Sequence, residues 1–254
     1  MTTVGMVLGS LCDMAPVERK MEFDNVGLLA GDAGQEVSRV LLCLDITMQA
    51  VEEARQQRCQ LIVSHHPLFF SLPKALRCDC YETAGVTRLL QYGISAICMH
   101  TNLDAADGGV NDCLAKKLGL NDIFLLNDEK IGRIGTLSCE KGLEEFLRDV
   151  IELLGCGGLR YCRGSGRVYR VAVGGGACGE YIPQAIAQGC DTFVTSDLRY
   201  NDFLDTRGLN LIDAGHFPTE NVVCPAVKTY LEEHFPEVKT VISTSHRDVI
   251  QYYL

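Results

Sequence analysis

The sequence lacks long apolar segments, basic runs and a basic N-terminus. None of its apolar runs approaches the roughly 20 residues that a membrane-spanning helix needs, so we expect no membrane partner. No basic residue precedes the short apolar stretch of residues 1–10, which predicts a cytoplasmic protein without a signal peptide. The formal net charge of −10 disfavours a nucleic-acid partner, because that binding depends on Lys and Arg neutralising phosphates.

Several catalytic and metal-binding motifs are also absent. The sequence has neither the G-x-S-x-G motif nor a Walker sequence. Its 13 cysteines include no C-x-x-C pair, and Cys78 and Cys80 form only C-x-C, which disfavours a cysteine metal site. Other cysteines lie inside apolar runs, so we expect reduced, buried thiols and no disulfide framework. The cysteines inside apolar runs are Cys43, Cys59, Cys98 and Cys190.

The chain does contain a clear β-α-β pattern. Residues 40–44 and 61–63 have the composition of buried strands, and residues 48–58 between them show helical periodicity. Pro67 ends the second strand. Such a unit predicts parallel strands joined by a right-handed crossover.

The second half of the chain repeats this pattern. An offset of 131 residues, which places Val40 on Val171, aligns residues 39–67 with 170–198 without a gap. Strands at 170–173 and 192–194 then flank a helix at 180–188. Matching element order and turn position indicate an internal repeat. The identical pairs are Arg39/Arg170, Val40/Val171, Ala54/Ala185, Gln57/Gln188, Cys59/Cys190 and Val63/Val194.

The repeat predicts the α/β fold class, with two similar, intertwined α/β units from an internal duplication and mostly parallel sheets flanked by helices. We place the first unit at residues 1–125 with 222–254 and the second at 126–221, with approximate boundaries. Within the second unit, residues 132–137 predict a strand and residues 141–154 a helix.

Histidines and carboxylates follow the predicted strands in both halves. His65 and His66 come after one strand, and strands at 93–97 and 208–212 lead to His-x-x-x-Asp and His-x-x-x-Glu. Ligands bind outside the carboxyl ends of parallel strands, and imidazole with carboxylate suits zinc, iron or manganese. The pattern therefore predicts a centre for two divalent metal ions. Its candidate residues are His65, His66, His100, Asp104, His216 and Glu220.

Structural interpretations compete with each of these signals. The His65–His66 pair could be polar groups at a strand edge, the 100–104 segment a hydrogen-bonded loop, and Pro218 with Glu220 a helix start. Residues 174–176 are three glycines that could bind phosphate through backbone N–H groups, although a tight turn is the commoner explanation. Asp45 and Thr47 are interpreted as helix-capping residues.

Ordered motifs over nearly the whole chain resemble the Nif-three-like dinuclear metal-centre family, whose members are often labelled GTP cyclohydrolase type 2 homologues. The motifs are Glu22-Phe-Asp-Asn-Val-Gly-Leu28, Ser64-His-His-Pro67, His100-Thr-Asn-Leu-Asp104, Thr195-Ser-Asp197 and Asp213-Ala-Gly-His-Phe-Pro-Thr-Glu220.

The resemblance implies two similar α/β units, a ring-shaped homohexamer and two metal ions in each subunit. It assigns the metal ligands to His65, His66, Asp104, His216 and Glu220, and makes His100 a residue that orients a ligand. Two positions depart from the pattern. Phe23 stands where many relatives have Trp, and Asn201 lies where many have a His that could shuttle protons.

Two functions fit these residues. The first is a metal-dependent hydrolase, because paired ions activate water and attract an anionic substrate such as a nucleotide or another phosphorylated small molecule. No catalytic acid or base can be assigned from the sequence. The alternative is a non-catalytic metal-binding scaffold, chaperone or regulatory protein. A plain α/β protein with structural histidines is the third possibility.

Overall fold

The computed structural model describes residues 1–253, and the chain divides into two compact units. Unit 1 comprises residues 1–107 and 224–247, and unit 2 comprises residues 108–223 and the segment from Asp248 onward. Each unit is thus built from two separate stretches of chain. Residues 108–125, which the sequence placed in the first unit, lie in unit 2 because they contain a helix and a strand that pack on its sheet.

Unit 1 is an α/β unit with one five-stranded sheet. Its elements are α1 (Val4–Met14), η1 (Val17–Arg19), β1 (Gly27–Ala30), β2 (Arg39–Cys43), α2 (Met48–Gln56), β3 (Leu61–Ser64), α3 (Tyr81–Tyr92), β4 (Ser95–Cys98), α4 (Thr101–Ala105), α9 (Cys224–His234) and β11 (Lys239–Ile242).

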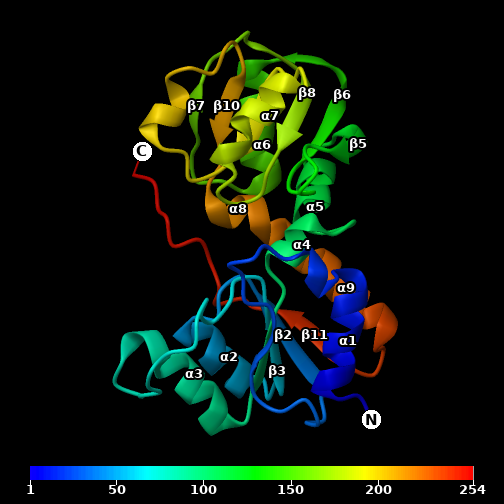
Figure 1. Cartoon of the computed structure of the whole chain (residues 1–254), viewed down its shortest axis with the longest axis vertical. Helices are drawn as coiled ribbons and strands as arrows, with labels where there is room; N and C mark the ends of the chain where they lie inside the picture. Colours follow the sequence, from blue (N-terminus) through cyan, green and yellow to red (C-terminus); the bar gives the residue numbers. More distant parts are fainter. Residues whose placement is uncertain (254) are drawn as a thin grey trace. The chain divides into compact units, whose positions relative to one another are not determined.

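The sheet of unit 1 has the order β1-β4-β3-β2-β11, and only β1 runs antiparallel to its neighbour. Helices α2 and α3 lie on one side of the sheet, and α1 and α9 lie on the other (Figure 1). Between the sheet and α2, Leu41 and Ile62 pack with Val51 in a buried cluster. All four residues of β3 and of β4 are buried, as expected of parallel strands covered on both faces.

Unit 2 carries a six-stranded sheet. Its elements are α5 (Val110–Lys117), β5 (Asn121–Leu125), β6 (Arg133–Gly142), α6 (Leu143–Leu154), β7 (Arg160–Cys162), β8 (Arg167–Val173), η2 (Gly179–Tyr181), α7 (Ile182–Ala187), β9 (Thr192–Thr195), η3 (Tyr200–Phe203), β10 (Asn210–Asp213), α8 (His216–Glu220) and η4 (Asn221–Val223).

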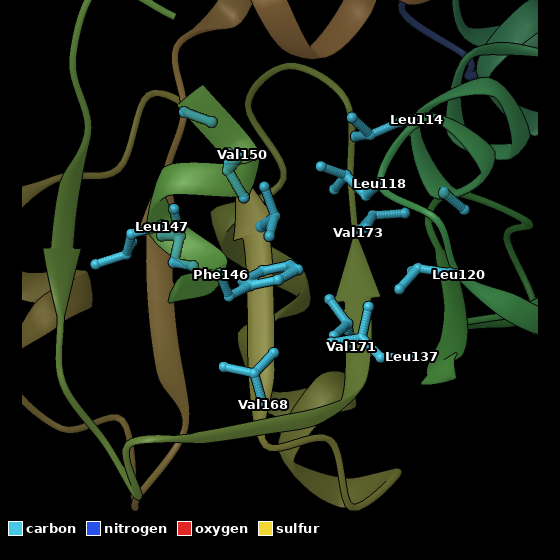
Figure 2. Close-up of a cluster of buried hydrophobic side chains, with 14 of the residues drawn as sticks. Leu114, Leu118, Leu120, Leu137, Phe146, Leu147, Val150, Val168, Val171 and Val173 are labelled. Carbon is cyan, nitrogen blue, oxygen red and sulfur yellow. The ribbon is translucent and has the colours of Figure 1, made fainter. Parts of the chain in front are cut away.

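The sheet of unit 2 has the order β5-β6-β8-β9-β10-β7. Strands β8, β9 and β10 are parallel, and β5, β6 and β7 add antiparallel pairs around them. Helices α5 and α6 pack on this sheet through a buried cluster that includes Leu114, Phe146 and Val171 (Figure 2). Strand β6 and helix α6 match the strand and helix expected over 132–137 and 141–154.

The internal duplication is visible in the strand register. In unit 1, Val40 pairs with Leu61, and in unit 2, Val171 pairs with Thr192, which are the same positions shifted by the offset found in the sequence. The backbone N–H of Gln60 donates to the Arg39 carbonyl at 3.1 Å, and that of Asp191 donates to the Arg170 carbonyl at 3.0 Å. The α/β class and the duplication are confirmed.

Local signals explain where several helices begin and end. Thr47 caps α2 by accepting a hydrogen bond from the Ala50 N–H, as expected. Helices α3 and α6 end at Gly93 and Gly155, whose positive φ angles of 63° and 69° suit glycine.

The cysteines are free thiols, in agreement with the sequence. All 13 are unbonded to one another, and Cys43, Cys59, Cys98 and Cys190 are buried. Burial raises the pKa of Cys59 to about 11, so this thiol stays protonated at neutral pH. Among residues 1–253, none of the helices combines the length and apolar character needed to cross a bilayer.

Candidate metal centre

In unit 1, three histidines lie just beyond the ends of two adjacent parallel strands. His65 and His66 follow β3, and His100 follows β4 as the residue before α4. Strands β3 and β4 are neighbours with Ser64 opposite Cys98, so their carboxyl ends lie side by side. The fold therefore brings histidines from two distant motifs to one edge of the sheet.

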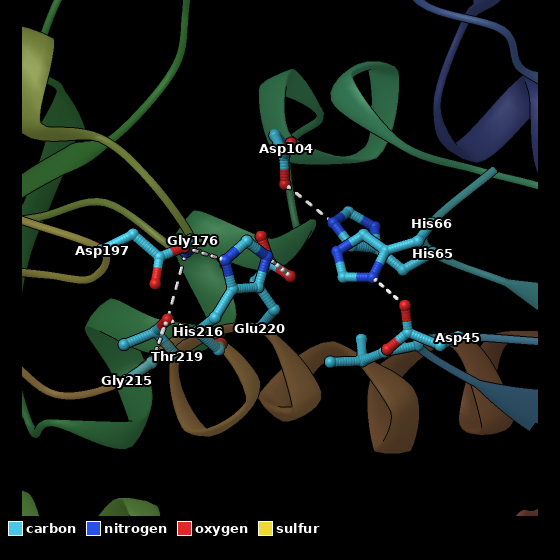
Figure 3. Close-up of polar contacts among 12 residues, drawn as sticks. Asp45, His65, His66, Asp104, Gly176, Asp197, Gly215, His216, Thr219 and Glu220 are labelled. Carbon is cyan, nitrogen blue, oxygen red and sulfur yellow. Dashed lines mark hydrogen bonds and ion pairs between the residues drawn. The ribbon is translucent and has the colours of Figure 1, made fainter. Parts of the chain in front are cut away.

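The three imidazole rings form a compact cluster, called the histidine cluster below. The ring centroids of His65 lie 5.1 Å from those of both His66 and His100. Each histidine offers one ring nitrogen, and these three atoms lie within 4.8 Å of one another. Nε2 of His65 also lies 3.5 Å from Oδ1 of Asp104 in α4 (Figure 3). The spacing is compatible with ligands around a metal ion.

Each histidine of the cluster uses Nδ1 to contact an acceptor. His65 Nδ1 donates to the Met99 carbonyl at 2.9 Å. His66 Nδ1 donates to Asp45 and His100 Nδ1 donates to Asp24, both at 2.8 Å. An imidazole protonated at Nδ1 presents its Nε2 lone pair, which is the arrangement seen in metal-binding histidines.

The two aspartates are themselves held in place. Asp24 is buried and also accepts the backbone N–H of Thr101 at 3.0 Å. Asp45 Oδ2 lies 3.2 Å from Nε2 of buried His246. Burial tends to raise the pKa of both carboxyls, but the hydrogen bonds from their histidines outweigh it and hold the pKa well below the ordinary value.

Unit 2 holds the corresponding pair in α8. His216 Nε2 lies 2.9 Å from Oε2 of buried Glu220, and His216 Nδ1 lies 2.5 Å from Oδ2 of Asp197. Partial burial would lower the pKa of His216, but the hydrogen bonds to Asp197 and Glu220 raise it to about 10. Two carboxylates around one imidazole favour a positive charge there, which a proton or a metal ion supplies.

Asp213, the last residue of β10, fixes the loops that carry this pair. Its carboxylate accepts the backbone N–H of Leu198 at 3.1 Å and that of Gly215 at 3.1 Å. Leu198 follows Asp197, and Gly215 precedes His216. One buried carboxylate therefore sets the position of both partners in the Asp197–His216 contact.

The three glycines after β8 do not form an open phosphate nest. The N–H of Gly174 donates to the Val194 carbonyl at 2.9 Å, that of Gly175 to Asn111 Oδ1 at 2.9 Å, and that of Gly176 to Thr219 Oγ1 at 3.1 Å. The phosphate-binding interpretation of this segment is wrong because protein acceptors occupy these amides. The loop instead packs on α8, and a Cβ at Gly176 would overlap Oε1 of Glu220.

Within each unit, the predicted residues lie together. His65, His66 and Asp104 converge in unit 1, and His216 and Glu220 converge in unit 2 (Figure 3). His100 packs in the same cluster as the expected ligands and receives its own orienting carboxylate.

Sequence reasoning missed the acceptors of Nδ1. Asp24 and Asp197 lie inside motifs that carried the family resemblance but had no assigned role. Asp45 was interpreted as a helix cap, which is wrong, because Thr47 caps α2 and Asp45 binds His66. Asp45 and Asp197 each lie two residues after a strand whose parallel neighbour leads to their histidine, and this placement was the signal that could have indicated these two pairs.

Comparison with known proteins agrees with the motifs. The family described as Duf34/NIF3 (NGG1p interacting factor 3) matches residues 2–249. A Clostridium perfringens protein named GTP cyclohydrolase 1 type 2 homolog is 30% identical over 97% of this chain and 98% of its own length. A Streptomyces coelicolor protein of the same name is 32% identical over 92% of this chain and 87% of its own.

Solved structures share the fold. A hypothetical protein from Staphylococcus aureus superposes with a TM-score of 0.92 and 30% identity, covering 99% of both chains. A Bacillus cereus protein related to NIF3 has a TM-score of 0.94 at 24% identity, again over 99% of both chains. The second likeness bears on the fold alone.

Proposed function

The chain belongs to the Duf34/NIF3 family, and we propose that it is a metal-dependent hydrolase that binds two divalent ions. Zinc, iron and manganese fit a donor set of imidazoles and carboxylates. The proposed ligands are His65, His66, Asp104, His216 and Glu220.

The observation that carries the proposal is the pairing of histidine Nδ1 atoms with aspartates. The four histidines that follow β3, β4 and β10 contact an acceptor through Nδ1, and in three of them the acceptor is an aspartate. His234 in α9 also contacts a carbonyl through Nδ1, so the features that favour metal binding are the aspartate acceptors and the closeness of the ring nitrogens within the histidine cluster. In His65 and His216, Nε2 lies beside a carboxylate, where a cation would be stabilised.

When bound, two ions would lower the pKa of a coordinated water and neutralise charge on the substrate. The residues of the chain orient the ligands and fix their protonation. Asp24, Asp45 and Asp197 add three negative charges to the two of the proposed ligands Asp104 and Glu220, so the four positive charges of two ions are balanced. An anionic substrate would therefore bind by direct coordination, with little long-range attraction and only a weak dependence on salt.

The substrate class is proposed from the relatives. Several are named GTP cyclohydrolase 1 type 2 homolog, which supports a nucleotide or another phosphorylated small molecule. The proposal covers hydrolysis and does not extend to GTP ring opening, which needs a general acid.

The test is a turnover assay on the full chain loaded separately with zinc, manganese or iron. We expect metal-dependent release of product from at least one nucleotide or phosphoester, detected by mass spectrometry. His65→Ala and Glu220→Gln should abolish it, while His234→Ala should not, because exposed His234 contacts only its own helix, where it stacks on Tyr230 and donates to the Tyr230 carbonyl at 2.8 Å. Stoichiometric metal with no turnover of any phosphorylated compound would instead support a non-catalytic metal-binding scaffold.

The homohexamer stays a prediction. Exposed Leu72, Leu76 and Leu90 line an apolar hollow in unit 1 together with Phe69, and such a patch fits burial against another subunit. Light scattering after size-exclusion chromatography should give six times the 27.9 kDa chain mass.

A further inference from the structure

Two exposed phenylalanines stand beside the histidine cluster, and we propose that they bind a planar ring carried by the substrate. Phe23 is 61% exposed and Phe70 is 57% exposed, although both are large apolar side chains. Their ring centroids lie 6.2 Å apart at an interplanar angle of 53°, and the Phe70 ring lies 5.9 Å from that of His100. We call Phe23 and Phe70 the aromatic platform. This inference rests on the proposed function and deepens it.

Hydrogen bonds fix the segments that carry the platform. Asp24, the neighbour of Phe23, accepts from His100 Nδ1 at 2.8 Å. Asn25 Nδ2 donates to the carbonyl of Phe69, the neighbour of Phe70, at 2.8 Å. Residues 23–25 thus connect the histidine cluster with the loop after β3. A platform held in this way loses little conformational entropy when a ligand binds.

The apolar side chains of this loop separate into two groups. Phe69 faces the hollow with Leu72 and Leu76, whereas Phe70 contacts His100. A subunit that covered Phe70 would also cover the adjacent His100 and block access to the proposed metal ligands. A small ligand is therefore the occupant that fits the platform.

The chemistry of the platform defines the ligand class. Phenylalanine offers a flat apolar face and no hydrogen bond, so it selects for a planar ring without distinguishing one heteroaromatic base from another. A ligand that binds the metals through an anionic group and also stacks on the platform would combine a phosphate with a heteroaromatic ring, as a nucleotide does. A simple sugar phosphate would lack the group that stacks.

The absence of tryptophan from the sequence permits a direct binding assay. In Phe70→Trp the introduced indole is the only one in the chain and retains a flat face. The metal-loaded variant is titrated with guanosine 5′-monophosphate, adenosine 5′-monophosphate and ribose 5-phosphate while its emission is recorded. We expect both nucleotides to quench emission and to bind at least about tenfold more tightly than ribose 5-phosphate, the effect of one stacked base. The two nucleotides should differ by less than about threefold.

Leucine variants test the flat face itself. Phe23→Leu and Phe70→Leu keep apolar bulk, so calorimetry with the same three ligands should show the nucleotide preference lost while ribose 5-phosphate affinity and metal content stay unchanged. Phe124→Leu is the matched control, because Phe124 is an exposed phenylalanine in β5 of unit 2. It should keep the preference.

Several results would overturn the platform. Equal affinity of the unmodified protein for guanosine 5′-monophosphate and ribose 5-phosphate, with metal bound, would refute it and leave the proposed function standing. Leucine variants that retain the nucleotide preference would also refute it. A smaller assembly in Phe23→Leu or Phe70→Leu would assign these residues to a subunit interface instead. Absence of both metal and binding would remove the proposed function and the platform together.

Discussion

The carboxylate of Asp45 accepts a hydrogen bond from Nδ1 of His66 at 2.8 Å, across 21 residues of sequence. Asp45 lies two residues after β2 and His66 lies two residues after β3, so the contact joins the carboxyl ends of two adjacent parallel strands. His246, which follows β11, approaches the same carboxylate from a third strand. Residues at the ends of three strands thus orient His66, one of the proposed metal ligands.

Asp45→Asn should weaken metal binding about 10- to 100-fold, because the amide no longer provides a charged acceptor for His66 Nδ1. The measurement is a competition titration with a metal chelator. Asp79→Asn is the control, since the exposed Asp79 side chain pairs only with Arg77 on the surface. Unchanged metal affinity in Asp45→Asn would show that this contact does not support a metal ligand.

Gly176→Ala should destabilise the protein and reduce metal binding. The residue has a φ of +66°, which costs an alanine about 1–2 kcal/mol, and the added Cβ would overlap Glu220. Gly189→Ala is a matched control, because its φ is +71° and nothing lies within 4 Å of the added Cβ. Thermal unfolding should show a larger loss of stability for Gly176→Ala than for Gly189→Ala, and only Gly176→Ala should lose metal. Equal losses of stability and of metal in both variants would rule out a specific role for the contact with Glu220.

The hydrogen bonds of the Glu53 carboxylate should make a pH-dependent contribution to the stability of the fold. This α2 residue accepts hydrogen bonds from the backbone N–H groups of Thr244 and Ser245, both at 3.0 Å, and from the Ser243 hydroxyl at 2.6 Å. Burial would raise the pKa of Glu53, but these hydrogen bonds lower it to about 2. The folded pKa lies below the unfolded one, so the stabilisation is present above pH 4.5 and is lost as the pH falls toward 2.

Glu53→Gln should therefore lower the free energy of unfolding by about 1.5–3 kcal/mol at pH 7, with a smaller deficit at pH 3. Urea titrations at both pH values measure it. Glu52→Gln, which removes a neighbouring surface carboxylate paired with Arg55 and Tyr92, should have a clearly smaller effect. A deficit of the same size at pH 7 and pH 3 would mean that the carboxylate charge is not responsible.

The repeated β-α-β units could be predicted from the sequence because their signals are local, within each strand and helix. Val40 and Val171 lie in short apolar strands, each followed by a helix and a second strand, and the common offset survives in the strand pairing. The strand ends then identified His65, His66 and His216 as candidates. Identifying these residues required only the rule that the carboxyl ends of parallel strands lie at one edge of the sheet.

The supporting contacts could not be predicted in the same way. Asp24 and His100 are 76 residues apart, and their pairing depends on how the loop before β1 crosses the end of β4. Glu53 contacts residues about 190 positions away, after β11. Edge strand β7 is only three residues long, too short for an alternation of apolar and polar residues to be recognised. Tertiary packing alone creates these relationships.

Metal content per subunit tests the central claim most directly. Inductively coupled plasma mass spectrometry should find about two divalent ions per chain in metal-replete protein, and about one or fewer in His65→Ala of unit 1 and in His216→Ala of unit 2. Fewer than about one ion in the unmodified protein, or full occupancy retained in both variants, would contradict the two-metal centre.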